Sequence, residues 1–149
     1  MLEYIKKNVI TVEMGIVAHG VNCQHRMASG VAKDIRARWP IVYDEYMKSP
    51  KGAAMLGTAQ LVRINEGQDD LFVANCYTQQ FYGYGGGSYA DTQSIADSLY
   101  AVAHHSDVFY LPIFMPRIGC GLGGLDWEKD VEPIVEEIAK LRDVFVCDL

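Results

Sequence analysis

The sequence predicts a three-layer α/β domain in which helices cover both faces of a central mixed sheet. Short apolar runs, typical of buried strands, alternate with segments whose apolar residues recur at helical spacing. Two glycine-rich loops each follow a predicted strand. The 149 residues suffice for about one ordinary domain, and no linker or repeat divides them. We therefore expect a single domain over 1–149.

The first half of the chain contains a strand–helix unit and then a pair of strands. The apolar run 16–21 is typical of a buried strand, and apolar spacing over 28–39 predicts the helix that follows it. Pro40 ends this helix, and 41–47 adds a helical turn or two. Two further strands flank a polar turn, at 59–64 and 71–76.

The second half repeats the alternation of strands and helices. Helices are predicted at 92–104 and 127–141, and strands at 108–115 and 144–147. Ligands of open α/β sheets bind beyond the carboxyl ends of the strands. Because both glycine loops follow strands, we expect them to lie at one rim of the sheet.

Composition and charge exclude several classes of function. The 13 basic and 19 acidic residues give a net charge of −6, whereas proteins that bind nucleic-acid backbones usually carry a basic surface. Long nucleic acid is therefore not an expected partner. No apolar run approaches the roughly 20 residues of a membrane helix, and the first residues lack a signal-peptide core. We expect a cytoplasmic protein without membrane contact, whose partner is a small molecule.

The cysteines and histidines do not indicate a metal site. The four cysteines lie far apart in sequence, none in Cys-x2-Cys spacing, so we expect reduced and mostly buried thiols. The four histidines lack Asp, Glu or Cys partners at ligand spacing. The sequence therefore predicts neither a metal ion nor another cofactor.

Two loops have the features of an anion site. In the first, 22–30, a polar loop follows a strand and Gly30 opens a helix, whose exposed main-chain amides attract anions. The second has four glycines between residues 119 and 124. Such a run is entropically unfavourable, and it favours a loop whose amides surround an anion. It lacks the Gly-Lys-Ser/Thr of a nucleotide P-loop, and the dinucleotide-binding spacing Gly-x-Gly-x-x-Gly is absent from the first strand–helix turn of the chain.

Together the two loops resemble those of the macrodomain family. His19-Gly20-Val21-Asn22-Cys23, followed by Gly30-Val31-Ala32, is similar to the family's first ligand loop. Met115-Pro116-Arg117-Ile118-Gly119-Cys120-Gly121 with Trp127 is similar to its second. The resemblance extends to the helix after Thr92 and to the last helix and strand. It implies a macrodomain fold that holds ADP-ribose or a close derivative between the loops.

Two branches of the family differ at positions that can be compared here. The branch that removes ADP-ribose from glutamate has a Lys and an Asp where this sequence has Gln79 and Gly123. The branch that hydrolyses ADP-ribose 1''-phosphate has a His like His19 and an Asn like Asn8. The resemblance thus implies a phosphatase. A module that binds without turnover and a deacylase or de-ADP-ribosylase acting at the distal ribose are the alternatives.

The resemblance also implies roles for individual residues. Asn8 and Val9 are expected near the adenine, Asn22 at the distal ribose, and Tyr82 over the ligand. The residues expected to enclose the diphosphate are Gly30, Val31 and Ala32 on one side, and Ile118, Gly119, Cys120, Gly121 and Leu122 on the other.

His19 and Asp91 are the catalytic candidates. His19 could accept a proton from water or attack phosphorus itself, or it could be a core histidine held by a hydrogen bond. Asp91 could orient His19 or the attacking water, or cap the helix that begins near Thr92. His25 and Arg26 could reach a terminal phosphate.

Overall fold

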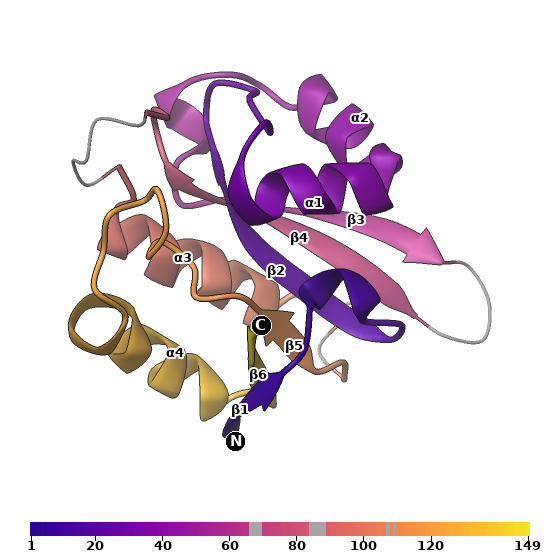
Figure 1. The fold of residues 1–149 in the computed structure, drawn as a ribbon, viewed down its shortest axis with the longest axis vertical. Helices are drawn as coiled ribbons and strands as arrows, with labels where there is room; N and C mark the ends of the chain where they lie inside the picture. Colours follow the sequence, from indigo (N-terminus) through magenta and orange to yellow (C-terminus); the bar gives the residue numbers. More distant parts are fainter. Residues whose placement is uncertain (66–69, 84–88, 107, 109) are drawn as a thin grey trace.

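The computed structural model describes residues 1–65, 70–83, 89–106, 108 and 110–149. Within these residues six strands form one sheet in the order β1-β6-β5-β2-β4-β3 (Figure 1). Neighbouring strands are parallel except β3 and β4, which pair antiparallel. The predicted mixed sheet is confirmed.

The strands are β1 (Leu2–Lys6), β2 (Gly15–Asn22), β3 (Ala59–Asn65), β4 (Leu71–Gln79), β5 (Ile113–Met115) and β6 (Val144–Asp148). The α-helices are α1 (Gly30–Arg38), α2 (Pro40–Lys48), α3 (Thr92–Ala103) and α4 (Glu132–Ala139). Short helical turns are η1 (Val9–Thr11), η2 (Ala53–Met55) and η3 (Trp127–Val131).

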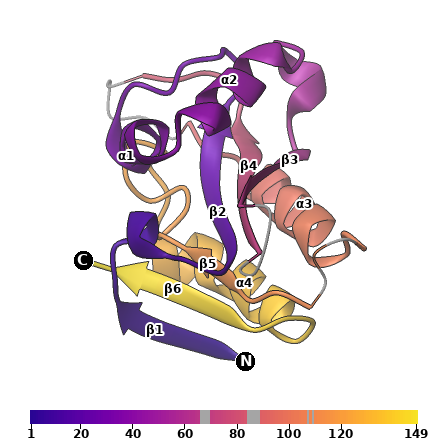
Figure 2. The ribbon, with the colours of Figure 1, turned by 90° about the vertical axis from the view of Figure 1, so that its right-hand side faces the viewer.

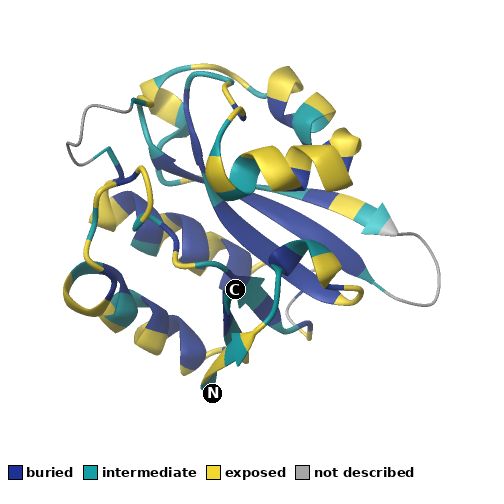
Figure 3. Ribbon diagram, in the orientation of Figure 1, coloured by how far each residue is buried: buried dark blue, intermediate teal, exposed yellow. Residues whose placement is uncertain are grey.

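Helices cover both faces of the sheet, α1 and α2 on one and α3 and α4 on the other (Figures 1 and 2). Side chains of β2 alternate between the two cores: Ile16 and Ala18 pack on the α3 side, while Val17 and Val21 pack on the α1 side. Figure 3 shows that the central strands β2 and β4 are buried on both faces. The three-layer prediction is confirmed. The alternation also places His19 on the α1 side.

The strand predicted at 108–115 is much shorter than expected and covers only β5. Val108 and Leu111 are buried, but they lie in turns that precede it. The buried guanidinium of Arg142 donates to the main-chain carbonyls of Ala103, Val108 and Leu111. These carbonyls are therefore engaged by a side chain rather than by a neighbouring strand.

Other differences lie at element boundaries. Pro40 ends α1 as predicted, and it also occupies the first turn of the nine-residue α2, where its missing N–H is tolerated. β1 was not predicted, because it is an edge strand on which only Leu2 and Ile5 are partly buried. Within the described ranges, each helix is too short or too polar to cross a bilayer.

Candidate functional site

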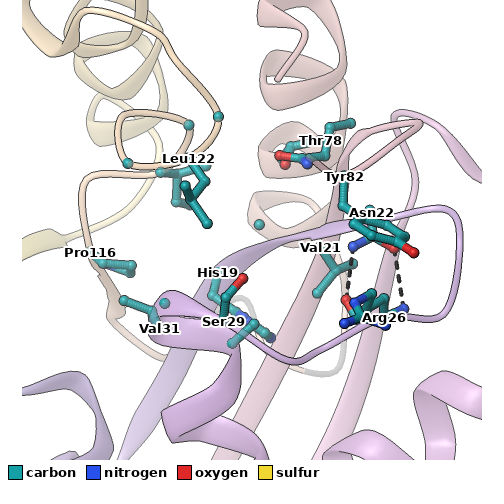
Figure 4. Close-up of a pocket in the computed structure, with 18 of the residues that line it drawn as sticks. His19, Val21, Asn22, Arg26, Ser29, Val31, Thr78, Tyr82, Pro116 and Leu122 are labelled. Carbon is teal, nitrogen blue, oxygen red and sulfur yellow. Dashed lines mark hydrogen bonds between the residues drawn. The ribbon is translucent and has the colours of Figure 1, made fainter. Parts of the chain in front are cut away.

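A cavity lies at the carboxyl ends of β2, β4 and β5, between the loops that follow them (Figure 4). Both predicted ligand loops reach it, which confirms that they share one rim of the sheet. The described residues that line the cavity are His19, Gly20, Val21, Asn22, Arg26, Ala28, Ser29, Gly30, Val31, Ala32, Thr78, Gln79, Tyr82, Gly83, Pro116, Arg117, Ile118, Gly119, Gly121, Leu122 and Gly123.

Asn22 shapes the first loop. Its Oδ1 accepts hydrogen bonds from the Gln24 amide and the Tyr46 hydroxyl, both at 2.9 Å. Its Nδ2 donates to the main-chain oxygen of Arg26 at 2.8 Å (Figure 4). His25 takes a positive φ of 58° in the turn that results. Asn22 therefore lines the cavity with an amide that already holds its own loop together.

The first turn of α1 presents unpaired main-chain amides to the cavity. The N–H groups of Gly30, Val31 and Ala32 have no acceptor within the described chain, as is usual at a helix start. Gly30 has a φ of +60°, and a Cβ there would meet nothing within 4 Å. The space above these amides is therefore open.

The second glycine loop also has main-chain amides without an acceptor among the described residues. The amides of Gly119, Gly121, Leu122 and Gly123 lack an acceptor in the part of the chain that is described. The loop closes on itself, since the Leu125 amide donates to the Gly119 carbonyl at 2.9 Å. A Cβ at Gly123 would lie 2.6 Å from that same carbonyl oxygen. The close main-chain approach explains why glycine is needed at residue 123.

The cavity is lined by two arginines and, among its described lining residues, by no carboxylate. The Arg26 guanidinium carbon lies 5.0 Å from the centre of the Tyr82 ring. The Arg117 guanidinium makes two hydrogen bonds to the Asp148 carboxylate, at 2.9 and 3.0 Å. In a chain with a net charge of −6, this local excess of positive charge suits an anionic ligand.

His19 lines the cavity from β2, although only 1 % of it is exposed. Its Nε2 lies 2.6 Å from Oδ1 of Asn75 on β4, while its buried Nδ1 has no hydrogen-bond partner among the described residues. Burial lowers the pKa of His19 to about 4, and the Asn75 hydrogen bond opposes this shift. The imidazole is therefore neutral at pH 7 and keeps one nitrogen able to accept a proton.

Asp91 caps α3. Its Oδ2 accepts from the main-chain nitrogen of Ser94 at 3.0 Å and from the Ser94 hydroxyl at 2.6 Å. It does not line the cavity, and the hydrogen-bond partner of His19 is Asn75 instead. Capping directs this carboxylate towards its own helix, so the predicted contact with His19 is not made. A role for Asp91 in orienting water stays a prediction.

Some predicted ligand residues lie outside the cavity lining. Asn8 caps η1, its Oδ1 accepting from the Ile10 amide at 3.2 Å, and Val9 is buried in the core beneath α1 and α2. The Cys120 thiol donates to the Ile118 carbonyl, and burial raises its pKa. The ligand contacts expected of Asn8, Val9 and Cys120 stay predictions.

The two other loop candidates differ in position. The His25 ring packs against the Tyr46 ring at 5.3 Å between centres, and His25 does not line the cavity. Arg26 does line it. Of the two, Arg26 is therefore the side chain placed to meet a phosphate.

Sequence reasoning missed Thr78. It is only 1 % exposed and lines the cavity, and its hydroxyl has no hydrogen-bond partner within the described residues. A hydroxyl that lines the cavity and makes no bond to the described part of the chain is free to bond a ligand or water atom. The available signal was a threonine two residues after the predicted strand 71–76, near the carboxyl end of a strand, where ligands of α/β sheets bind.

Comparison with known proteins assigns the chain to a family. No family model matches the sequence. The chain is 30% identical over 153 residues to an ADP-ribose 1''-phosphate phosphatase of Candida albicans, covering 95% of this chain and 96% of that protein. It is 25% identical over 146 residues to a DNA ADP-ribosyl glycohydrolase of Mycobacterium tuberculosis, covering 97% of this chain but 40% of the relative. Both relatives are hydrolases by name.

Its fold matches the macrodomain of Mycobacterium tuberculosis DarG with a TM-score of 0.82 at 20% identity, over 100% of this chain and 98% of that one. A three-layer α/β domain with two amide-bearing loops at the carboxyl rim of its sheet is a ligand-binding domain suited to phosphates. The chain belongs to the macrodomain family. Within that family it is similar to the ADP-ribose 1''-phosphate phosphatases, as the sequence predicted.

Proposed function

We propose that the protein binds ADP-ribose derivatives in the cavity and hydrolyses ADP-ribose 1''-phosphate to ADP-ribose and phosphate. The observation that carries the proposal is the presence of two sets of unpaired main-chain amides on one cavity, from the start of α1 and from the second glycine loop. Such amides bind phosphate oxygens without needing a net positive charge. The name of the Candida albicans relative supports the choice of substrate.

In this proposal the diphosphate lies between the two amide sets. Asn22 contacts the distal ribose, and Tyr82 covers the ligand from the side that also carries Arg26. Arg26 is then the cation nearest the terminal phosphate. The adenine extends towards Asn8 and Val9.

His19 is the proposed proton acceptor. Of the described residues lining the cavity, only His19 has a neutral basic nitrogen that can accept a proton during the reaction, since the remainder are arginines or lack a basic group. Water attacks phosphorus, its proton passes to Nδ1 of His19, and the bond from phosphorus to the ribose oxygen breaks. The proton that Nδ1 accepted then passes to that oxygen, directly or through water, so that it leaves as the ribose hydroxyl and His19 is neutral again. The amides and Arg26 stabilise the charge on the phosphoryl oxygens.

A direct attack by Nδ1 on phosphorus is the other possible use of the same nitrogen. The phosphoryl group is then transferred to His19, its bond to the ribose oxygen breaks, and that oxygen takes a proton from solvent. Water attacks the phosphohistidine in a second step and releases phosphate. Trapping of a phosphorylated enzyme from labelled substrate distinguishes this route from direct attack by water.

Phosphate release from ADP-ribose 1''-phosphate tests the proposal. We expect His19→Ala to be slower by roughly 100-fold or more, the usual effect of losing a general base, with ADP-ribose affinity close to wild type by calorimetry. His104→Ala is the matched control, because His104 ends α3 and does not line the cavity. Equal rates for wild type and His19→Ala would remove His19 from the mechanism. No release by wild type would refute the phosphatase.

Cleavage at the distal ribose by a deacylase or de-ADP-ribosylase is a second candidate. The relative named as a DNA ADP-ribosyl glycohydrolase favours it. Two positions argue against glutamate as the leaving group. Gln79 stands where the glutamate-specific branch has a Lys, and Gly123 stands where that branch has an Asp. A comparison of phosphate, acetyl and glutamyl leaving groups on ADP-ribose separates the two activities.

Binding without turnover is a third candidate, favoured by the burial of His19 Nδ1. ADP-ribose binding in calorimetry, together with no release of any of the three leaving groups, is the result expected of such a module.

A further inference from the structure

A row of hydrogen bonds crosses the sheet from α2 to His19. Nε2 of Gln60 on β3 donates to the main-chain oxygen of Glu45 at 2.8 Å. Nδ2 of Asn75 on β4 donates to Oε1 of Gln60 at 3.0 Å, and Oδ1 of Asn75 lies 2.6 Å from Nε2 of His19. Gln60 and His19 are both register partners of Asn75, so the three side chains lie side by side on adjacent strands.

The row has a defined direction because one end of it is main chain. A carbonyl oxygen can only accept, so Gln60 must turn its NH2 group to Glu45 and its oxygen to Asn75. Asn75 must then donate to Gln60 and turn its own oxygen to His19. An amide oxygen cannot donate, so the hydrogen bond at 2.6 Å requires a proton on Nε2 of His19.

We propose that Gln60 and Asn75 are positioning residues that hold His19 in its Nε2–H tautomer and so leave Nδ1 with a free lone pair for the ligand in the cavity. The inference rests on the proposed function, in which Nδ1 accepts a proton or attacks phosphorus. With the proton on Nδ1 instead, that nitrogen could do neither.

Burial strengthens this selection. Asn75 is fully buried and His19 is 1 % exposed, so water cannot replace the amide as a partner of Nε2. A turned Asn75 would set its oxygen against Oε1 of Gln60, so that two buried acceptors face each other without a proton between them. Its NH2 group would then face Nε2 of His19, which could accept only in the Nδ1–H tautomer. That tautomer therefore comes at the expense of the hydrogen bond to Gln60. Among the residues that the structure describes, none bonds to Nδ1 and so favours the other tautomer.

Nitrogen-15 NMR of histidine-labelled protein tests the proposal, because the two imidazole nitrogens give different signals in each neutral tautomer. His19→Gln assigns the resonances. We expect wild-type His19 to be in the Nε2–H form at pH 7. Asn75→Asp should keep this form, since a carboxylate also accepts from Nε2. Asn75→Leu should populate the Nδ1–H form because it removes the acceptor of the Nε2 proton. Gln60→Met should do the same because the Asn75 amide is then free to turn.

Kinetics supply the functional readout. Gln60→Met and Asn75→Leu should lower kcat for phosphate release by roughly tenfold, part of the effect of a general base, with KM within about twofold. Gln93→Met is the matched control, since Gln93 bonds only to the exposed Asp97 on α3. It should change neither the tautomer nor kcat. Circular dichroism verifies that each variant folds. If Asn75→Leu does not fold, the comparison of Gln60→Met with Asn75→Asp still decides the test.

Two results would overturn the proposal: wild-type His19 in the Nδ1–H form, or an Nε2–H form that persists unchanged in both Gln60→Met and Asn75→Leu. The failure of the proposed function is separate. The wild-type protein could hold His19 in the Nε2–H form in a way that depends on Gln60 and yet release no phosphate. That result would refute the phosphatase but leave the positioning of His19 in place.

Discussion

Gly20 and Thr78 approach each other on neighbouring strands so closely that a Cβ at residue 20 would lie 2.6 Å from the Thr78 hydroxyl oxygen. Both residues line the cavity, between His19 and the loop that follows β4. The missing side chain at residue 20 therefore makes room for a hydroxyl that makes no hydrogen bond within the described part of the chain. The first two predictions follow from this contact.

Gly20→Ala should destabilise the protein by about 1–3 kcal/mol, the usual effect of overpacking a buried site. The clash is with Oγ1, whereas the Thr78 Cβ would be 3.7 Å away. Thr78→Ala should therefore relieve most of the effect. A double-mutant cycle in urea unfolding measures this coupling, and strictly additive effects would contradict the contact.

Thr78→Val should weaken ADP-ribose binding by about 1 kcal/mol, roughly fivefold in Kd, because it removes one hydrogen bond and keeps the shape. Thr78→Ser keeps the hydroxyl and should bind nearly as the wild type does. Calorimetry with ADP-ribose measures both. Equal affinity of the valine variant would mean that the hydroxyl does not contact the ligand.

Acid should destabilise the protein through His19. Its pKa is about 4 in the folded chain, below its ordinary value of 6.5, so the unfolded chain binds the proton first as the pH falls. Stability from the neutral imidazole is complete above pH 6.5 and is lost towards pH 4. Between pH 7.5 and 5, wild type should lose about 2 kcal/mol more than His19→Gln in urea unfolding. Parallel losses in the two proteins would contradict the burial of a neutral histidine.

The glycines of the second loop should differ in their tolerance of a side chain. Gly123→Ala places a Cβ 2.6 Å from a main-chain oxygen, which cannot move without opening the loop. Gly121→Ala meets nothing within 4 Å, and residue 121 does not have a positive φ. Thermal unfolding should show a lower Tm for Gly123→Ala, by several degrees, and little change for Gly121→Ala. Similar Tm values for the two variants would argue against the close approach.

Local patterns in the sequence were enough to predict most of the fold and the rim that holds the site. Apolar spacing predicted β2, β4, α1, α3 and α4 because each pattern depends on a few adjacent residues, whereas α2 was expected only as a helical turn or two. The glycine loops were found for the same reason: both lie directly after a strand, and the carboxyl ends of parallel strands meet at one rim.

Only the tertiary structure decided which side chains meet. The strand predicted at 108–115 is short because Arg142 engages the main-chain carbonyls of Val108 and Leu111. Arg142 is 31 residues from Leu111 in sequence. The partner of His19 is Asn75, separated from it by 56 residues, whereas Asp91 turns to its own helix. Residues so distant come together through strand order and register, which depend on the packing of the whole sheet. The sequence by itself determined that two glycine-rich loops and a histidine share one rim. The packing decided how that histidine is held.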